Sequence, residues 1–169
     1  MQRRRDANAT KMGGGPRIMS GVKRGPVPPL FLLLGLLLQW GLHVFLPIAR
    51  LVPEAWTVWG TVPIAVGVGV VVHVASQFSK VNTAINPFDE PSVLVTSGVF
   101  QVSRNPIYLA MVVTLIGAAI AWGTLSTFVV PPALVWLLSS KFIAMEEAAL
   151  NQSFGLEYER YQGQVRRWL

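Results

Sequence analysis

Three long stretches of the sequence contain no Asp, Glu, Lys or Arg, and they constrain the fold more than any other feature. They run over Gly25–Ala49, Ala55–Ser79 and Asn105–Ser140, with 25, 25 and 36 residues, which is 86 of the 169 residues in the chain. A soluble domain of this size interleaves charged side chains with its apolar positions, because the outer face of each helix meets water. The pattern therefore argues against an ordinary soluble enzyme and favours an integral membrane protein.

The lengths of these stretches indicate how many helices cross the membrane. A hydrocarbon core of about 30 Å needs roughly 20 apolar helical residues. The first two stretches each supply one span, Leu30–Leu46 and Trp56–Phe78, whereas the third is long enough for two, Pro106–Trp122 and Thr127 to about Ala144. Strands of a β-barrel are excluded because the apolar runs are continuous instead of alternating. We therefore predict an all-α integral membrane protein, a bundle of about four transmembrane helices.

The first 24 residues differ in charge from the rest of the chain. They hold seven Lys and Arg against one Asp, which accounts for the whole formal net charge of +6, because the remaining residues carry seven basic and seven acidic side chains. We predict a disordered basic tail over residues 1–24 and a single membrane domain over residues 25–169. A basic tail does not create a basic folded surface, so nucleic acid is not an expected partner.

The positions of Lys and Arg predict how the bundle is oriented. With four spans, 13 of the 14 basic residues lie on the side shared by the tail, the long loop between the second and third spans, and the C-terminal segment. The positive-inside rule makes this side cytoplasmic, and in a bacterium the membrane would be the plasma membrane. Trp56, Trp59 and Trp122 then fall near the opposite interface, where indole rings prefer to lie.

Two segments on the predicted cytoplasmic side carry most of the reactive side chains. The loop before the third span ends in Arg104-Asn105-Pro106-Ile107-Tyr108, with Pro106 suited to the first position of a helix. Glu146 and Glu147 follow the fourth span, near the membrane boundary, where an unpaired carboxylate is costly. Neighbours on a helix point about 100° apart, so we expect the two carboxylates to have different partners, one of them water or a basic residue such as Arg104.

The C-terminal segment shows a helical pattern of apolar and aromatic side chains. Leu150, Phe154, Tyr158, Tyr161 and Val165 recur at spacings of three and four residues. Such a stripe is typical of an amphipathic segment that lies on the bilayer surface, and we interpret it in this way.

The order and spacing of these motifs resemble those of a known superfamily. The block Leu94–Phe100 (LVTSGVF), the element Arg104–Tyr108 (RNPIY), the pair Glu146-Glu147 and the run Phe154–Tyr161 (FGLEYERY) are similar to segments of the isoprenylcysteine carboxyl methyltransferase and phospholipid N-methyltransferase superfamily. These are integral-membrane enzymes that use S-adenosylmethionine (AdoMet), and the resemblance covers residues 78–169. It implies transfer of a methyl group from AdoMet to a lipophilic carboxylate, amine or thiol reached from the bilayer. The cofactor would bind to the cytoplasmic loop, beside the C-terminal helix.

The resemblance also implies which residues contact AdoMet. This donor carries an ammonium, a carboxylate, ribose hydroxyls and an adenine, so its pocket needs an acceptor such as Glu146, amide groups and flat aromatic faces. A guanidinium such as that of Arg104 suits the carboxylate. Methyl transfer from a sulfonium is an in-line displacement, so we expect neither a nucleophilic side chain nor a metal, and we assign no catalytic residue. The expected cofactor contacts are Thr83, Ser92, Val93, Leu94, Val95, Phe100, Arg104, Asn105, Pro106, Ile107, Tyr108 and Glu146, with His73, Lys141 and Glu147 as weaker candidates for substrate contact.

The methyl acceptor stays open at this stage. Where the carboxyl methyltransferases usually have His, Gly and a basic residue, this chain has Asn105, Ala110 and Phe142. The segment Gly67-Val68-Gly69 fits a Gly-x-Gly pattern of the phospholipid N-methyltransferases, although small residues at helix contacts are the usual explanation. The alternative to an enzyme is a small four-helix transporter or a structural membrane protein without catalysis. The sequence indicates no oligomeric state.

Overall fold

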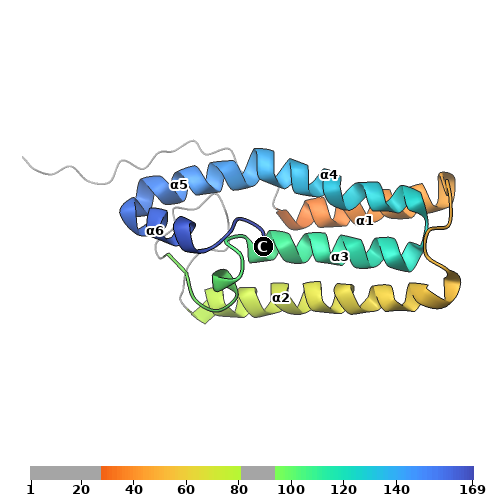
Figure 1. Ribbon diagram of the computed structural model, residues 1–169, viewed down its shortest axis with the longest axis horizontal. Helices are drawn as coiled ribbons and strands as arrows, with labels where there is room; N and C mark the ends of the chain where they lie inside the picture. Colours follow the sequence, from red (N-terminus) through yellow and green to blue (C-terminus); the bar gives the residue numbers. More distant parts are fainter. Residues whose placement is uncertain (1–27, 81–93) are drawn as a thin grey trace, which may run out of the picture.

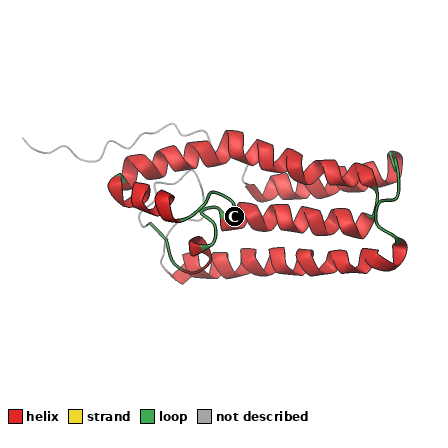
Figure 2. Cartoon of the chain, viewed as in Figure 1, coloured by secondary structure: helices red, strands yellow, loops and turns green. Residues whose placement is uncertain are grey.

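The computed structural model describes residues 28–80 and 94–169, and Figure 1 shows how they are arranged. These residues are helical apart from their connections, and the strand-like pairing within them is confined to an isolated bridge between Arg50 and Thr124 (Figure 2). The predicted all-α fold is therefore confirmed. The predicted basic tail over residues 1–24 lies outside the described residues.

The described residues form a series of helical elements. In chain order they are α1 (Pro28–Phe45), the 3-10 helix η1 (Glu54–Gly60), α2 (Thr61–Lys80), the 3-10 helix η2 (Gly98–Gln101), α3 (Pro106–Trp122), the 3-10 helix η3 (Leu125–Val129), α4 (Val130–Leu137), the π-helix η4 (Leu138–Ile143), α5 (Ala144–Phe154) and α6 (Leu156–Gln164).

The predicted spans coincide with helices in the structure. The third, α3, begins and ends at the predicted residues. The fourth is longer than predicted, because the elements from η3 to α5 join into one helical run, Leu125–Phe154. By length and composition, this run and Glu54–Val74 are each able to cross a membrane, while Leu30–Phe45 and Pro106–Trp122 are shorter apolar helices.

The long helices lie side by side, with α3 in the middle (Figure 1). Helix α3 contacts α1, α2 and α4, and most of its side chains are buried. We call the end of the bundle that holds α6 and the start of α3 the motif end, and the opposite end the turn end. The core around α3 consists of Tyr108, Met111, Val112, Leu115, Val130, Leu134, Leu138, Phe142 and Ile143.

Close packing of α2 on α3 depends on glycine. A methyl group built on Gly67 would lie 2.6 Å from the carbonyl oxygen of Ala110 and would collide with the Thr114 hydroxyl. The same addition to Gly117 would lie 2.6 Å from the carbonyl oxygen of Gly60. Gly69 has no neighbour within 4 Å of such a methyl group. Gly67 therefore has a packing role, whereas Gly69 points away from the bundle.

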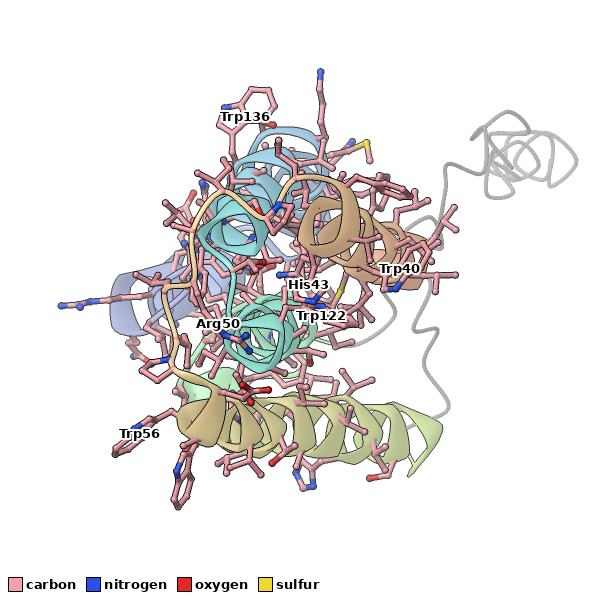
Figure 3. The ribbon with its side chains drawn as sticks, turned by 90° about the vertical axis from the view of Figure 1, so that its right-hand side faces the viewer. Trp40, His43, Arg50, Trp56, Trp122 and Trp136 are labelled. Atoms are coloured by element: carbon pink, nitrogen blue, oxygen red, sulfur yellow. The ribbon has the colours of Figure 1, made fainter. Side chains whose placement is uncertain are left out.

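Polar contacts join the helices near the turn end. The buried side chain of Gln39 in α1 donates from Nε2 to the carbonyl oxygens of Leu115 (2.9 Å) and Thr127 (3.2 Å). One turn further along α1, the ring of His43 packs on that of Trp122 with 5.0 Å between their centroids. Figure 3 looks onto this end and shows Trp56 pointing away from the bundle.

The outward faces of the long helices are apolar. Exposed large side chains on α1 and α2 include Leu33, Leu34, Leu37, Leu38, Val62, Val66, Val68 and Val72. A water-soluble bundle of this size would carry charged residues at such positions. The surface of the described bundle is therefore suited to contact with lipid.

Candidate functional site

A tyrosine and a glutamate from different helices meet at the motif end. Pro106 is the first residue of α3, and this start places Tyr108 in the first turn of the helix, where its side chain is buried. The Tyr108 hydroxyl donates a hydrogen bond of 2.5 Å to Oε1 of Glu146, in the first turn of α5. The buried hydroxyl and the half-buried carboxylate therefore satisfy each other.

The neighbouring glutamate points to two arginines. Nη2 of Arg104 lies 3.2 Å from Oε1 of Glu147, and both side chains are only 12% exposed. Nε of Arg167 donates to the same oxygen at 3.1 Å, and its Nη2 donates to Oε2. The two carboxylates thus have different partners, as their spacing on the helix predicts. The hydrogen bonds to Glu147 raise the pKa of Arg167 above its usual value.

Two nitrogens of the Arg104 guanidinium form no hydrogen bond with the described residues. These are the buried Nε and Nη1 atoms, although the Tyr158 hydroxyl also interacts with the same guanidinium. A buried N–H group without an acceptor is rare in proteins, and a guanidinium is a strong donor. The motif end therefore holds a buried cation able to bind an anionic group.

The last residues of the chain run across this site. After α6, the segment Val165–Leu169, here called the crossing segment, reaches the start of α3, where the C-terminus is marked in Figure 1. The carbonyl oxygen of Arg166 accepts the backbone N–H of Arg104 at 3.0 Å. The carbonyl oxygen of Arg167 accepts from the Ser103 hydroxyl (3.2 Å) and from Nδ2 of Asn105 (3.1 Å).

An aromatic cluster lies beside the polar groups. Tyr158 and Tyr161 of α6 are buried, and the Tyr161 hydroxyl donates to the carbonyl oxygen of Phe100 at 2.7 Å. Burial raises the pKa of Tyr158 and raises that of Tyr161 to about 12, so both hydroxyls keep their protons at neutral pH. Leu150, Phe154 and Val165 pack against the same cluster. Our interpretation of this stripe as a segment lying on the bilayer is wrong, because its side chains cover the loop before α3.

The π-helix η4 precedes the two glutamates. A π turn holds more residues than an α turn, so it changes which face of the following helix meets the bundle, and such turns are frequent at functional sites. Within η4, Phe142 is buried and its ring packs against that of Phe31 at a centroid distance of 5.1 Å. The next residue toward the N-terminus, Lys141, is exposed.

The structure brings together some of the residues expected from the sequence. Around the start of α3, Tyr108 pairs with Glu146, and Arg104, Glu147 and Asn105 belong to a second group that is joined through Arg167. Pro106 is buried at that start, and Ile107 packs against both hydrophobic clusters of the bundle. Leu94 and Val95 pack beside Phe100 in the aromatic cluster.

Other expected residues lie apart from this group or cannot be placed in it. The side chains of Lys141 in η4 and His73 in α2 are exposed. Thr83, Ser92 and Val93 lie outside the described residues. Conversely, sequence reasoning missed the crossing segment, since a pair of arginines after a helix gives no sign of the backbone groups that its carbonyl oxygens will meet.

Two curated plant proteins resemble part of this chain. A probable protein-S-isoprenylcysteine O-methyltransferase of Oryza sativa subsp. indica is 31% identical over 78 residues, which are 46% of this chain and 41% of the rice protein. Protein-S-isoprenylcysteine O-methyltransferase A of Arabidopsis thaliana is also 31% identical over 78 residues, 46% of this chain and 40% of that protein. The match thus spans about two fifths of the length of these relatives. No solved structure matches the chain significantly.

The family match extends over most of the described bundle. Residues 56–157, more than half of the chain, match the sequence profile of the family described as phospholipid methyltransferase. The matched range runs from η1 to the start of α6 and includes both the Tyr108–Glu146 pair and the Arg104–Glu147 pair. This chain belongs to the phospholipid methyltransferase family.

Proposed function

We propose that this protein is an integral-membrane methyltransferase that transfers a methyl group from AdoMet to a lipophilic acceptor. The observation that carries the proposal is the family match over residues 56–157, within which the start of α3 and the first turn of α5 meet through Tyr108 and Glu146. The names of the rice and Arabidopsis relatives, both O-methyltransferases, support the reaction class.

The proposal places all four helical runs across the membrane as one domain over residues 25–169. Support comes from the two runs long enough to cross it and from the exposed apolar faces of α1 and α2. Exposed Trp56 and Trp59 at the turn end suit an interface. The motif end, the tail and the loop before α3 would then face the cytoplasm, because they hold nearly all of the basic residues.

The residues at the motif end fit AdoMet in the chemistry of their donors and acceptors. Oε1 of Glu146 accepts from Tyr108, and the second carboxylate oxygen suits the ammonium group of the donor. The unpartnered Nε and Nη1 of Arg104 suit its carboxylate. Phe100 offers an aromatic face for the adenine. We therefore assign the cofactor site to Leu94, Val95, Phe100 and Arg104–Tyr108 with Glu146, and extend the proposal to Thr83, Ser92 and Val93.

The methyl donor supplies an electrophilic methyl group on its sulfonium. What the chain contributes is alignment, because an in-line displacement depends on the distance and angle between the methyl group and the attacking atom. Tyr108 lies in α3 and Glu146 in α5, so the hydrogen bond between their side chains holds these two helices together at the proposed site. The aromatic cluster around Tyr158 and Tyr161 covers the loop side and keeps water away.

The acceptor is proposed to reach the site from the bilayer. An open apolar groove of about 190 Å³ runs between α1 and α4, and Phe31, Leu34, Gly35 and Leu38 form its α1 wall. Phe31 also contacts Phe142, which belongs to the same core cluster as Tyr108, and we propose that the acceptor passes this aromatic pair to reach the motif end. Because Phe142 is buried and apolar, it offers no cation to a carboxylate acceptor, and we keep the acceptor class at a lipophilic compound. Glu147, Lys141 and His73 remain weaker candidates for contact with it.

Labelled methyl transfer tests the proposed reaction. Membranes containing the protein are incubated with AdoMet labelled on its methyl group, and lipid, protein and volatile fractions are separated. We expect label in a lipid-extractable product, strongly reduced with Glu146→Ala and unchanged with Glu159→Ala, since Glu159 is exposed on α6. Label no higher than in membranes lacking the protein would contradict the proposal.

A further inference from the structure

We propose that Arg167 is a positioning residue for the carboxylate of the methyl donor, acting through Glu147 and Arg104. This inference rests on the proposed function, because it assigns a role to one residue of the proposed donor site. Arg167 lies in the crossing segment, beyond the residues 56–157 of the family match. Its side chain is 42% exposed, and its proposed role follows from the hydrogen bonds that it donates to Glu147.

The side chain of Arg167 fixes the carboxylate that holds Arg104. Oε1 of Glu147 accepts from Nε of Arg167 (3.1 Å) and lies 3.2 Å from Nη2 of Arg104, while Oε2 accepts from Nη2 of Arg167. A guanidinium that donates hydrogen bonds to both oxygens of a carboxylate fixes the plane of the carboxylate as well as its position. The direction in which Glu147 holds Arg104 is therefore set by Arg167.

The backbone of the same segment fixes the other end of Arg104. The carbonyl oxygen of Arg167 accepts hydrogen bonds from the side chains of Ser103 and Asn105, the residues on either side of Arg104. The backbone N–H of Arg104 itself donates to Arg166 at 3.0 Å. The crossing segment thus holds both the backbone and the charged group of Arg104, which leaves this long side chain little freedom.

The nitrogens of Arg104 that form no hydrogen bond with the described residues indicate a ligand. Nη2 is occupied by Glu147, but Nε and Nη1 are buried without an acceptor in the described part of the chain. Glu147 is shared between two guanidinium groups, those of Arg104 and Arg167, so it does not neutralise Arg104 alone. Arg104 also lies two residues before Pro106, the first residue of α3, and the start of a helix favours a negative group. A carboxylate on the methyl donor satisfies both observations.

Two ligands that differ in the amino-acid portion, which carries this carboxylate, test the inference. S-adenosylhomocysteine has the amino-acid carboxylate, whereas 5′-methylthioadenosine shares its adenine, ribose and thioether sulfur but lacks the amino-acid portion. Purified full-length protein in detergent is titrated with each ligand by calorimetry, for the wild type, Arg104→Ala, Arg167→Ala and the double variant. Arg166→Ala is the matched control, because the Arg166 side chain is exposed and its carbonyl bond to Arg104 is kept.

We expect each single variant to weaken S-adenosylhomocysteine binding about tenfold, about 1.4 kcal/mol, and to change methylthioadenosine binding less than twofold. The double variant should be no weaker than Arg104→Ala, because Arg167 acts through Arg104. Should Arg167→Ala not fold, Arg167→Lys is the second variant. It keeps the positive charge and the backbone hydrogen bonds but cannot donate to both oxygens of Glu147 from a planar group. We expect it to weaken binding of S-adenosylhomocysteine several-fold and to leave binding of methylthioadenosine unchanged.

The contrary outcomes separate this inference from the proposed function. Equal losses for both ligands would mean that Arg167 only supports the fold, and undiminished binding by the Arg167 variants would remove its role; either result overturns the inference while the donor site stands. If the wild type binds neither ligand, the proposed methyl-donor site is wrong and the positioning role falls with it.

Discussion

The Tyr108 hydroxyl donates a hydrogen bond of 2.5 Å to Oε1 of Glu146 and so joins the start of α3 to the first turn of α5. Both residues lie at the motif end of an apolar bundle, where a carboxylate without a donor would be costly. The bond thus links two of the family motifs, the element Arg104–Tyr108 and the pair Glu146-Glu147. Loss of this hydrogen bond should lower both the stability of the fold and the affinity for the methyl donor.

Tyr108→Phe removes this hydrogen bond and leaves Oε1 of Glu146 without its donor. We expect the free energy of unfolding to fall by about 1–3 kcal/mol, the usual cost of leaving a buried polar group unpaired. Thermal unfolding of the detergent-solubilised protein measures the change. Glu159→Gln on the exposed face of α6 is the control and should change stability by less than about 0.5 kcal/mol. Equal stability of Tyr108→Phe and the control would contradict the role of the bond.

Gly67→Ala and Gly69→Ala should change stability in opposite directions, although they lie two residues apart in α2. A methyl group on Gly67 meets the backbone of α3 at Ala110, so overpacking should cost about 1–3 kcal/mol. A methyl group on Gly69 meets nothing within 4 Å, and the better helix propensity of Ala should stabilise by up to about 1 kcal/mol. Paired thermal-shift measurements check the signs. Similar effects of the two variants would mean that α2 does not pack on α3 through Gly67.

Tyr161→Phe should loosen the loop before α3, since it removes the hydrogen bond to the carbonyl oxygen of Phe100. We expect a loss of about 1–3 kcal/mol in unfolding free energy at neutral pH. Because burial raises the pKa of Tyr161 in the folded protein from its usual 10.0 to about 12, this contribution is constant below pH 10 and declines as the pH rises toward 12. The free energies of unfolding of the wild type and of Tyr161→Phe are compared at pH 7, 9 and 11. A difference in favour of the wild type that grows between pH 9 and 11 would contradict this prediction.

Much of the fold follows from the sequence because lipid imposes a simple rule. Long charge-free runs must become helices, so α3 could be predicted to its terminal residues from Pro106 and the turn after Trp122. The divergence of Glu146 and Glu147 also follows from helix geometry alone. These features depend on local chain properties, which a single sequence displays.

The remaining features depend on contacts between distant segments. The stripe of Tyr158 and Tyr161 has the same spacing whether it meets a bilayer or a protein loop, and burial against Phe100 decides between them. The π turn in η4 has no distinctive residue pattern in LSSKFI. The crossing segment acts largely through backbone carbonyl oxygens, which every residue has, so its place beside Arg104 could not be foreseen.

Titration of the purified protein with S-adenosylhomocysteine tests the central claim most directly. Calorimetry on the wild type should show saturable binding, and Glu146→Ala should weaken it at least about tenfold, since the carboxylate paired with Tyr108 is proposed to hold the ammonium group. Glu157→Ala, exposed on α6, should bind like the wild type. Absence of binding by the wild type, or equal affinity for Glu146→Ala and the wild type, would contradict a methyl-donor site at the start of α3.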